Sequence, residues 1–182
     1  MKLFPVIIAV ALVSVSGCAE EANWKKEIDE QVGLLGHRNM IIIADSAYPI
    51  QVGGGVNVIA TGADHQEVVS HAVKAIEKCP AVRPLVALDA EFAFVPEEHA
   101  PGAAKLRKSI LAILEGKSAA PVREELHDTL LKEVNELAKD YTVVVFKTTG
   151  VIPYSSVFLT LDCGYWSAEA EEALRKNMEE NR

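Results

Sequence analysis

The sequence has little positive charge. It contains 18 Lys and Arg against 26 Asp and Glu, and its formal net charge is −8 at pH 7. Such a chain offers no basic patch that would release counterions from phosphates, which argues against nucleic acid as a partner. The same charge disfavours adhesion to anionic lipid, so that attachment to a membrane would have to come from a lipid anchor.

Motifs for nucleotides, acyl transfer and metals are also missing. The glycines at 53–55 match neither a phosphate loop nor a dinucleotide loop, and they predict a flexible loop. No Gly-x-Ser-x-Gly elbow occurs. Asp64, His65, Glu67 and His71 are suitable ligand types, but the two histidines are six residues apart and fall on different faces of a predicted helix. Solvated polar side chains are the better interpretation, and we expect no metal site.

The first residues are predicted to be a targeting signal. Lys2 precedes an apolar run over 3–15 that is too short to span a bilayer but suits a signal-peptide core. Val-Ser-Gly-Cys at 15–18 resembles the lipobox of bacterial lipoproteins, which implies removal of residues 1–17 and lipidation of Cys18. An ordinary secretory signal is the alternative. We expect an exported chain, held by its lipid at the cell envelope on the periplasmic or outer-membrane side.

Residues 18–182 are long enough for one domain with a sizeable core. Patterning predicts helices over 20–35, 64–78, 103–114, 122–139 and 167–181, and strands over 40–44, 56–60, 84–94, 141–147 and 156–161. This alternation predicts a single α/β domain with a largely parallel sheet flanked by helices. The last helix is polar nearly all round and is expected to be a solvated tail or an oligomer edge. Cys79 and Cys163 could pair in an oxidising compartment, but single buried thiols are the expected outcome.

Polar residues bracket the most apolar predicted strand, 40–44. His37 precedes it and Asp45 follows it. At about 3.3 Å per residue this stretch spans roughly 25 Å, so both side chains cannot reach one small substrate within a straight strand. They meet only if the chain bends or if another copy supplies one of them. On residue chemistry alone, Asp45 caps the backbone and Pro49 ends the strand.

Two motifs resemble the ribose pyranase and fucose mutarotase family (RbsD and FucU). Gly36-His37, followed by Asp45 and by Ala-Tyr-Pro at 47–49, is similar to the Gly-His…Asp-Ala…Pro signature near the family's N-terminus. Pro-Tyr-Ser-Ser-Val-Phe-Leu at 153–159, with Cys-Gly-Tyr at 163–165, is similar to the family's closing strand. The likeness covers about 34–166, although its middle fits only by the order of elements.

The resemblance implies a cofactor-independent isomerase that interconverts the anomers or ring forms of a monosaccharide. One group must take the proton of the anomeric hydroxyl while another protonates the ring oxygen. The resemblance provides three catalytic candidates, His37, Asp45 and Tyr154. Candidates for binding the substrate are Arg38, His127 and Ser156. It further implies a ring-shaped homo-oligomer with sites at subunit contacts.

Several positions depart from the family pattern. Asn39 and Ser156 stand where the family usually has Asp and Asn, and Ser46 replaces Ala. The changes leave a non-catalytic monosaccharide-binding lipoprotein as an alternative, and a purely structural surface lipoprotein as a third possibility. His127 also has a simpler interpretation, as an exposed residue on the surface of a helix.

Overall fold

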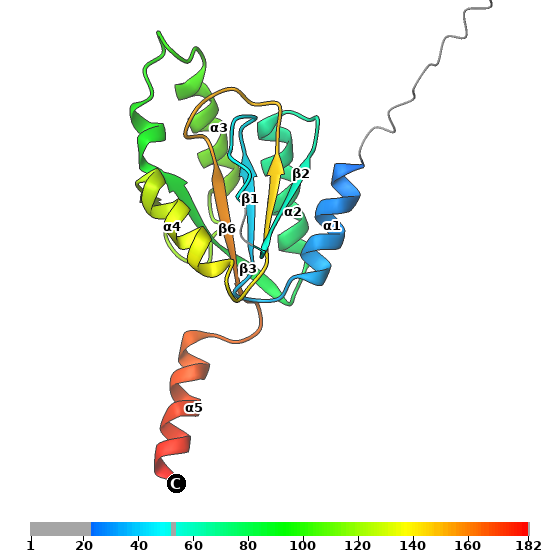
Figure 1. Cartoon of the computed structure of the whole chain (residues 1–182). Helices are drawn as coiled ribbons and strands as arrows, with labels where there is room; N and C mark the ends of the chain where they lie inside the picture. The colour runs from blue at the N-terminus through cyan, green and yellow to red at the C-terminus, as the bar shows by residue number, and fades with distance from the viewer. Residues whose placement is uncertain (1–22, 52–53, 182) are drawn as a thin grey trace, which may run out of the picture.

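A computed structural model describes residues 23–51 and 54–181. The expected signal at 1–17 and the expected lipid attachment at Cys18 lie outside these residues. The strands are β1 (Met40–Ala44), β2 (Val56–Ala60), β3 (Val82–Asp89), β4 (Arg123–Glu125), β5 (Val143–Lys147) and β6 (Val157–Cys163). The helices are α1 (Trp24–Leu34), α2 (His65–Lys78), the 3-10 helix η1 (Ala90–Phe94), α3 (Ala103–Leu114), α4 (His127–Leu137) and α5 (Ala168–Glu180) (Figure 1).

The strands form one sheet in the order β2-β5-β1-β6-β3-β4. Only β6 runs antiparallel to its neighbours, β1 and β3, whereas the other neighbouring pairs are parallel. The carboxyl ends of β1 to β5 and the amino end of β6 therefore meet at one edge of the sheet, which we call the carboxyl edge. The prediction of a single α/β domain with a largely parallel sheet is confirmed.

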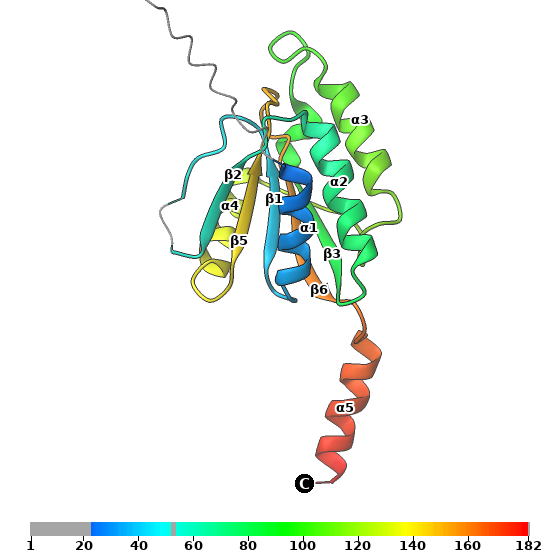
Figure 2. The ribbon, with the colours of Figure 1, turned by 90° about the vertical axis from the view of Figure 1, so that its right-hand side faces the viewer.

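Strand β1 lies at the centre of the fold because every one of its residues is apolar and buried. Ile41 and Ile43 point into the larger core, which α1, α2 and α3 cover. Met40, Ile42 and Ala44 point the other way, into a smaller core beneath α4. Figure 2 shows α1, α2 and α3 on one face of the sheet and α4 behind it. The alternation along one strand thus fixes a three-layer arrangement.

The predicted helix caps are present. The Asp64 side chain accepts a hydrogen bond from the backbone N–H of Glu67, and α2 begins at the next residue. Ser167 accepts from the backbone N–H of Ala170 in the same way. These contacts satisfy backbone donors that would otherwise lack a partner in the first turn of each helix.

Two predicted elements are wrong in extent. The strand expected over 84–94 ends at Asp89 and continues as η1, because beyond Asp89 neither β6 nor β4 continues the ladder. The helix expected over 122–139 begins only at His127. Its first residues, Arg123–Glu125, pair instead with the open edge of β3. In both cases the presence or absence of a neighbouring strand overrides the local pattern.

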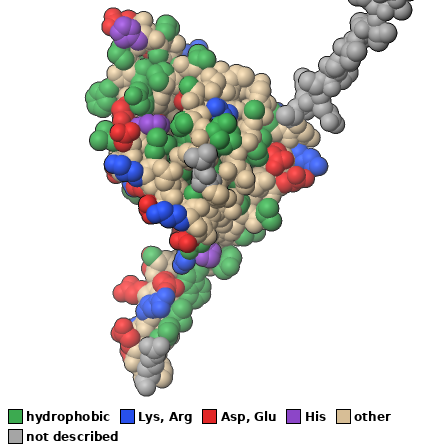
Figure 3. Space-filling view, in the orientation of Figure 1, with side chains coloured by type: hydrophobic (Ala, Val, Ile, Leu, Met, Phe, Trp, Pro, Cys, Tyr) green, Lys and Arg blue, Asp and Glu red, His purple; other side chains and the backbone are tan. Residues whose placement is uncertain are grey.

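Helix α5 extends away from the domain and contains no buried residue (Figures 1 and 3). The prediction that it lies outside the core is confirmed. Hydrophobic side chains form a stripe along one of its sides (Figure 3). Leu174 and Met178 are exposed hydrophobic residues of this helix. Among the described helices, none combines the length and the apolar character that crossing a bilayer requires.

Candidate active site

A cavity of about 360 Å³ opens at the carboxyl edge of the sheet. It is lined by residues 45–49 after β1, by His127 at the start of α4, and by Val151, Pro153 and Tyr154 from the loop between β5 and β6. In open α/β sheets this edge is where ligands usually bind. The fold therefore brings together three of the predicted residues, Asp45, His127 and Tyr154, from distant parts of the sequence.

His127 is paired with a buried carboxylate. Its Nδ1 lies 2.9 Å from Oδ1 of Asp89, whose side chain is fully buried at the end of β3, while the His127 side chain is 24% exposed. When Nδ1–H donates to this carboxylate, Nε2 is the ring nitrogen with the free lone pair. Nε2 has no hydrogen-bond partner within the described part of the chain. The pair is thus arranged so that one imidazole nitrogen can exchange a proton with a ligand.

The start of α4 is fixed by a second acid. Both carboxylate oxygens of Glu91, in η1, accept the backbone N–H of His127 at 3.1 Å. Burial raises the pKa of Asp89, whereas its hydrogen bond with His127 lowers it and the nearby Glu91 and Asp45 raise it further, leaving the pKa above its ordinary value. His127 is therefore held by two carboxyl groups, Asp89 at the imidazole and Glu91 at the backbone N–H.

Tyr154 packs against His127. The two rings are nearly perpendicular, at 82°, and their centroids are 5.6 Å apart. The backbone of Tyr154 has a φ of 57°, in the left-handed region that non-glycine residues seldom occupy. Such a conformation persists only where the surrounding structure holds it. The tyrosine ring is 41% exposed and forms one wall of the cavity.

Three buried side-chain oxygens at this edge have no hydrogen-bond partner among the residues that the structure describes: Tyr48 Oη, Asp89 Oδ2 and Ser156 Oγ. In β6, Val157 pairs with Ile43 and Leu88, and the register therefore places Ser156 beside Asp89. Burial raises the pKa of Tyr48, and the charges of Asp89 and Asp45 raise it further, which keeps its hydroxyl protonated. Buried polar groups of this kind are uncommon in folded proteins and mark the edge as a polar site.

Asp45 has two roles in the structure. One carboxylate oxygen, Oδ1, accepts the backbone N–H of Ala47 at 2.7 Å, which confirms that Asp45 caps the turn after β1. The residue also lines the cavity together with His127 and Tyr154. Capping the turn uses Oδ1, and the other carboxylate oxygen of Asp45 remains available to a ligand in the cavity.

His37 and Arg38 lie at the opposite edge, before β1. His37 is exposed. The Arg38 guanidinium donates to the hydroxyl of Tyr141 at 2.9 Å, and its backbone N–H donates to Leu161 O. One copy of the chain therefore does not bring His37 to Asp45, in agreement with the length of the strand between them. Any contact of His37 with the cavity must come from another copy.

The simple interpretations of two histidines are wrong. His127 is not a freely exposed helix residue, since it lies against Asp89 and Tyr154. His65 is not solvated either, because it is only 2% exposed and both of its ring nitrogens are hydrogen-bonded. Each histidine stands at the first position of its helix, where the side chain turns back toward the sheet.

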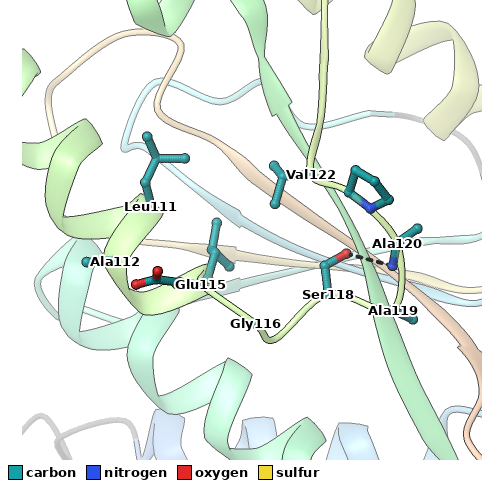
Figure 4. A pocket seen from close by; sticks show the side chains of 10 residues that line it. Leu111, Ala112, Glu115, Gly116, Ser118, Ala119, Ala120 and Val122 are labelled. Atoms are coloured by element: carbon teal, nitrogen blue, oxygen red, sulfur yellow. Dashed lines mark hydrogen bonds between the residues drawn. The ribbon is translucent and has the colours of Figure 1, made fainter.

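Larger cavities lie elsewhere. Figure 4 shows one of about 720 Å³ between the end of α3 and the segment 118–122, with mostly small apolar side chains and a single carboxylate, that of Glu115. Another, of about 470 Å³, includes Asn39 and Tyr141 at the opposite edge of the sheet. Neither places a histidine beside a carboxylate. A third, of about 480 Å³, contains His71, Asp64 and Glu67, but there Asp64 caps α2, Glu67 pairs with Lys25, and His71 Nε2 is bonded to Asp29. Size alone therefore does not identify the site. The described residues contain no group of three His, Cys, Asp or Glu that could hold a metal ion.

Sequence reasoning missed Asp89, Tyr48 and Glu91. A signal for Asp89 exists, because it follows a buried apolar run as Asp45 does. Since the carboxyl ends of parallel strands meet at one edge, two such acids belong together. The partnership of Asp89 with His127 has no local signal, because the two residues are 38 positions apart.

Comparison with known proteins identifies the fold. No protein-family model matches the chain, and no curated protein sequence matches it. Among solved structures, RbsD of Bacillus subtilis in complex with D-ribose is 17% identical and aligns with a TM-score of 0.54 over 78% of this chain and 93% of its own. The chain thus has the fold of RbsD, as its two motifs predicted.

Two further structures are similar to this chain. A fucose mutarotase of Streptococcus pneumoniae in complex with L-fucose is 14% identical, with a TM-score of 0.48 over 72% of this chain and 87% of its own. FucU of Bifidobacterium longum is 16% identical, with a TM-score of 0.48 over 74% of this chain and 92% of its own.

Proposed function

We propose that this protein is a monosaccharide mutarotase or pyranase that interconverts sugar anomers or ring forms by general acid–base catalysis. The observation that carries the proposal is the His127–Asp89 pair beside Tyr154 in the cavity at the carboxyl edge. The fold supports it, because RbsD, which shares this fold, was solved with D-ribose. The proposed enzyme needs no cofactor.

In the proposed reaction, Nε2 of His127 takes the proton of the anomeric hydroxyl. The oxygen's electron pair then forms the carbonyl, the bond from the anomeric carbon to the ring oxygen breaks, and the ring oxygen gains a proton. Tyr154 is the candidate donor of that proton. Rotation and reclosure on the other face, with the proton transfers reversed, give the second anomer. Positioned acid–base groups of this kind contribute on the order of 10²–10⁴-fold.

Other residues are suited to holding the sugar. The second carboxylate oxygen of Asp45 can accept a hydrogen bond from a sugar hydroxyl. The Tyr154 ring offers a face for the apolar side of a pyranose. Ser156 lies beside Asp89 beneath the cavity, where its hydroxyl adds polarity. Asp89 is fully buried, and we assign it to orienting His127 rather than to contacting the sugar.

We further propose a homo-oligomer in which a second copy covers the cavity and brings His37 and Arg38 to it, within a ring-shaped assembly. The support is an apolar rim around the carboxyl edge. Its members are 41–82% exposed, and each follows or precedes a strand at that edge: Ile50, Phe94, Leu126, Val151 and Tyr154. Clustered apolar side chains of this size usually mark an interaction surface.

The proposed location is the cell envelope. Export by the leader and lipidation of Cys18 would hold the enzyme outside the cytoplasm by its acyl chains alone. Replacement of Cys18 by Ala is expected to release the protein from the membrane fraction, and retention of the variant there would contradict the anchor.

A non-catalytic monosaccharide-binding protein is the second candidate. The observation that favours it concerns Asn39. Its side chain accepts a hydrogen bond from the backbone N–H of Thr142 and donates one to Gly36 O. Both ends of the amide are thus bonded within the fold, and Asn39 has no charge to give to a reaction.

Anomer exchange measured by NMR separates the two functions. The chain without residues 1–18 is mixed with pentoses, deoxyhexoses and hexoses in turn. Faster exchange of one sugar supports the enzyme, and its loss in His37→Ala supports the contribution of a second copy. Saturation transfer to a sugar without faster exchange supports the binding protein instead.

A further inference from the structure

His65 connects the two ends of the loop that carries Tyr154. Its ring is buried beneath the loop, with Nδ1 3.0 Å from Thr148 Oγ1 and Nε2 2.9 Å from Ser155 O. Thr148 begins the loop after β5, and Ser155 ends it just before β6. One imidazole therefore links the two ends of the loop through its two ring nitrogens.

The chemistry of the two contacts fixes the tautomer. A backbone carbonyl only accepts hydrogen bonds, so Nε2 must carry the proton that goes to Ser155 O. Burial lowers the pKa of His65, which favours the neutral ring. Nδ1 then carries a lone pair that faces the hydroxyl of Thr148. This hydroxyl has one proton, which it donates either to Nδ1 or to Ala44 O, 2.9 Å away at the end of β1.

The loop is packed closely on this ring. A Cβ added to Gly150 would lie 3.1 Å from Cβ of His65 and 3.2 Å from Oγ1 of Thr148, so the loop backbone leaves little room for a side chain there. Gly150 O in turn accepts the backbone N–H of Ser46 at 2.8 Å, next to Asp45. The loop is thereby tied both to α2 and to the segment that forms the opposite wall of the cavity.

Ser155 directly follows Tyr154, the residue held at a φ of 57°. That conformation costs free energy unless neighbouring contacts maintain it. The hydrogen bond to Ser155 O is the contact nearest to it along the chain, and Ser155 Oγ adds a second by donating to Ile152 O at 2.7 Å.

We infer that His65 is a positioning residue of the site. Its imidazole links the two ends of the loop 148–156 and so holds the Tyr154 ring against His127. The catalytic consequence rests on the proposed function, whereas the effect on the order of the loop does not. No proton passes through His65 to the substrate, since both of its ring nitrogens are engaged within the fold.

The test compares three variants of the mature protein. His65→Phe keeps a ring but removes both hydrogen bonds, and His65→Gln keeps a donor that can reach Ser155 O. His71→Phe is the matched control, because His71 lies on the same helix but bonds Asp29 and Lys25 O on α1. Amide hydrogen exchange of the loop 148–156 is measured by mass spectrometry, together with kcat and KM for anomer exchange.

We expect His65→Phe, which loses two buried hydrogen bonds, to speed exchange in this loop by about 10- to 100-fold, without a matching change in β1. His65→Gln should restore most of the protection and of kcat, and His71→Phe should leave the loop unchanged. Loop exchange at the wild-type rate in His65→Phe would overturn the inference. If that variant does not fold, Thr148→Val tests the same contact with a smaller expected effect, and an unchanged loop there would overturn it equally.

The two proposals fail in different ways. If the wild-type protein accelerates anomer exchange of no sugar but His65→Phe speeds amide exchange of the loop, the proposed function fails and the positioning role of His65 is supported. If the wild-type protein is active and His65→Phe changes neither the amide exchange of the loop nor kcat, the positioning role of His65 fails and the proposed function is supported.

Discussion

Asp89 is a buried carboxyl group at the site. Its side chain is fully buried, yet within the described part of the chain only Oδ1 has a hydrogen-bond partner. Burial disfavours the charged carboxylate and raises its pKa above the value of the unfolded chain. A carboxyl group whose pKa is raised by folding binds more protons in the folded state, so stability falls as the pH rises from the unfolded pKa through the folded one.

Asp89→Asn is therefore expected to remove a pH-dependent loss of stability while it lowers activity. The amide oxygen can still accept from His127, but it supplies no charge to orient and stabilise the imidazolium. We expect the free energy of unfolding of the wild type to fall relative to the variant as the pH rises from about 4 toward neutrality. Urea unfolding at both pH values measures this, and an identical difference at each pH would contradict it. Anomer exchange should slow by about 10²-fold.

Tyr154 is assigned a hydroxyl that protonates the ring oxygen. Tyr154→Phe keeps the ring against His127 and removes only that hydroxyl, so kcat is expected to fall by roughly 10- to 100-fold with little change in KM. Tyr165→Phe is the control, since Tyr165 is exposed and lies outside the cavity. Wild-type kcat in Tyr154→Phe would remove the tyrosine from the proton transfer.

Local pattern predicted some elements well because their signals are local. Strand β1 is a continuous apolar run, and α2 begins where Asp64 caps it. The start of α4 was not predicted, because Arg123–Glu125 becomes a strand only beside β3.

The residues of the site also differ in whether a local sequence pattern indicates them. Asp45, His127 and Tyr154 were predicted, whereas the role of Asp89 depends on a contact between β3 and α4 that no local pattern reports. His65 reads as a polar residue at the start of a helix. Only the loop packed on it reveals its burial.

Helix α5 contributes little to the stability of the domain, because none of its residues is buried. Deletion of residues 168–182 is expected to change the free energy of unfolding by less than about 0.5 kcal/mol. Ile28→Ala, at a fully buried position on α1, is the contrasting variant and should cost about 2–5 kcal/mol. Chemical denaturation measures both, and a large loss on deletion would mean that α5 packs against something.

At the scale of the whole molecule, the site faces outward at an apolar rim. Val151→Asp places a charge at a side chain that is 82% exposed in one copy, so the fold should tolerate it while self-association weakens. Lys74→Asp on α2 is the control for a new acidic side chain at an exposed position outside the rim. Sedimentation velocity measures the assembly. A wild-type protein that is monomeric and fully active would contradict the proposed oligomer.

The most direct test of the central claim is NMR anomer exchange with His127→Gln beside His99→Gln. His99 is an exposed loop histidine outside the cavity, and its replacement controls for the loss of one imidazole. Acid–base catalysis at the carboxyl edge predicts faster exchange of at least one monosaccharide by the wild type and by His99→Gln, and a loss on the order of 10²-fold in His127→Gln. Equal acceleration by all three proteins would contradict the role of His127, and acceleration by none would contradict the enzyme.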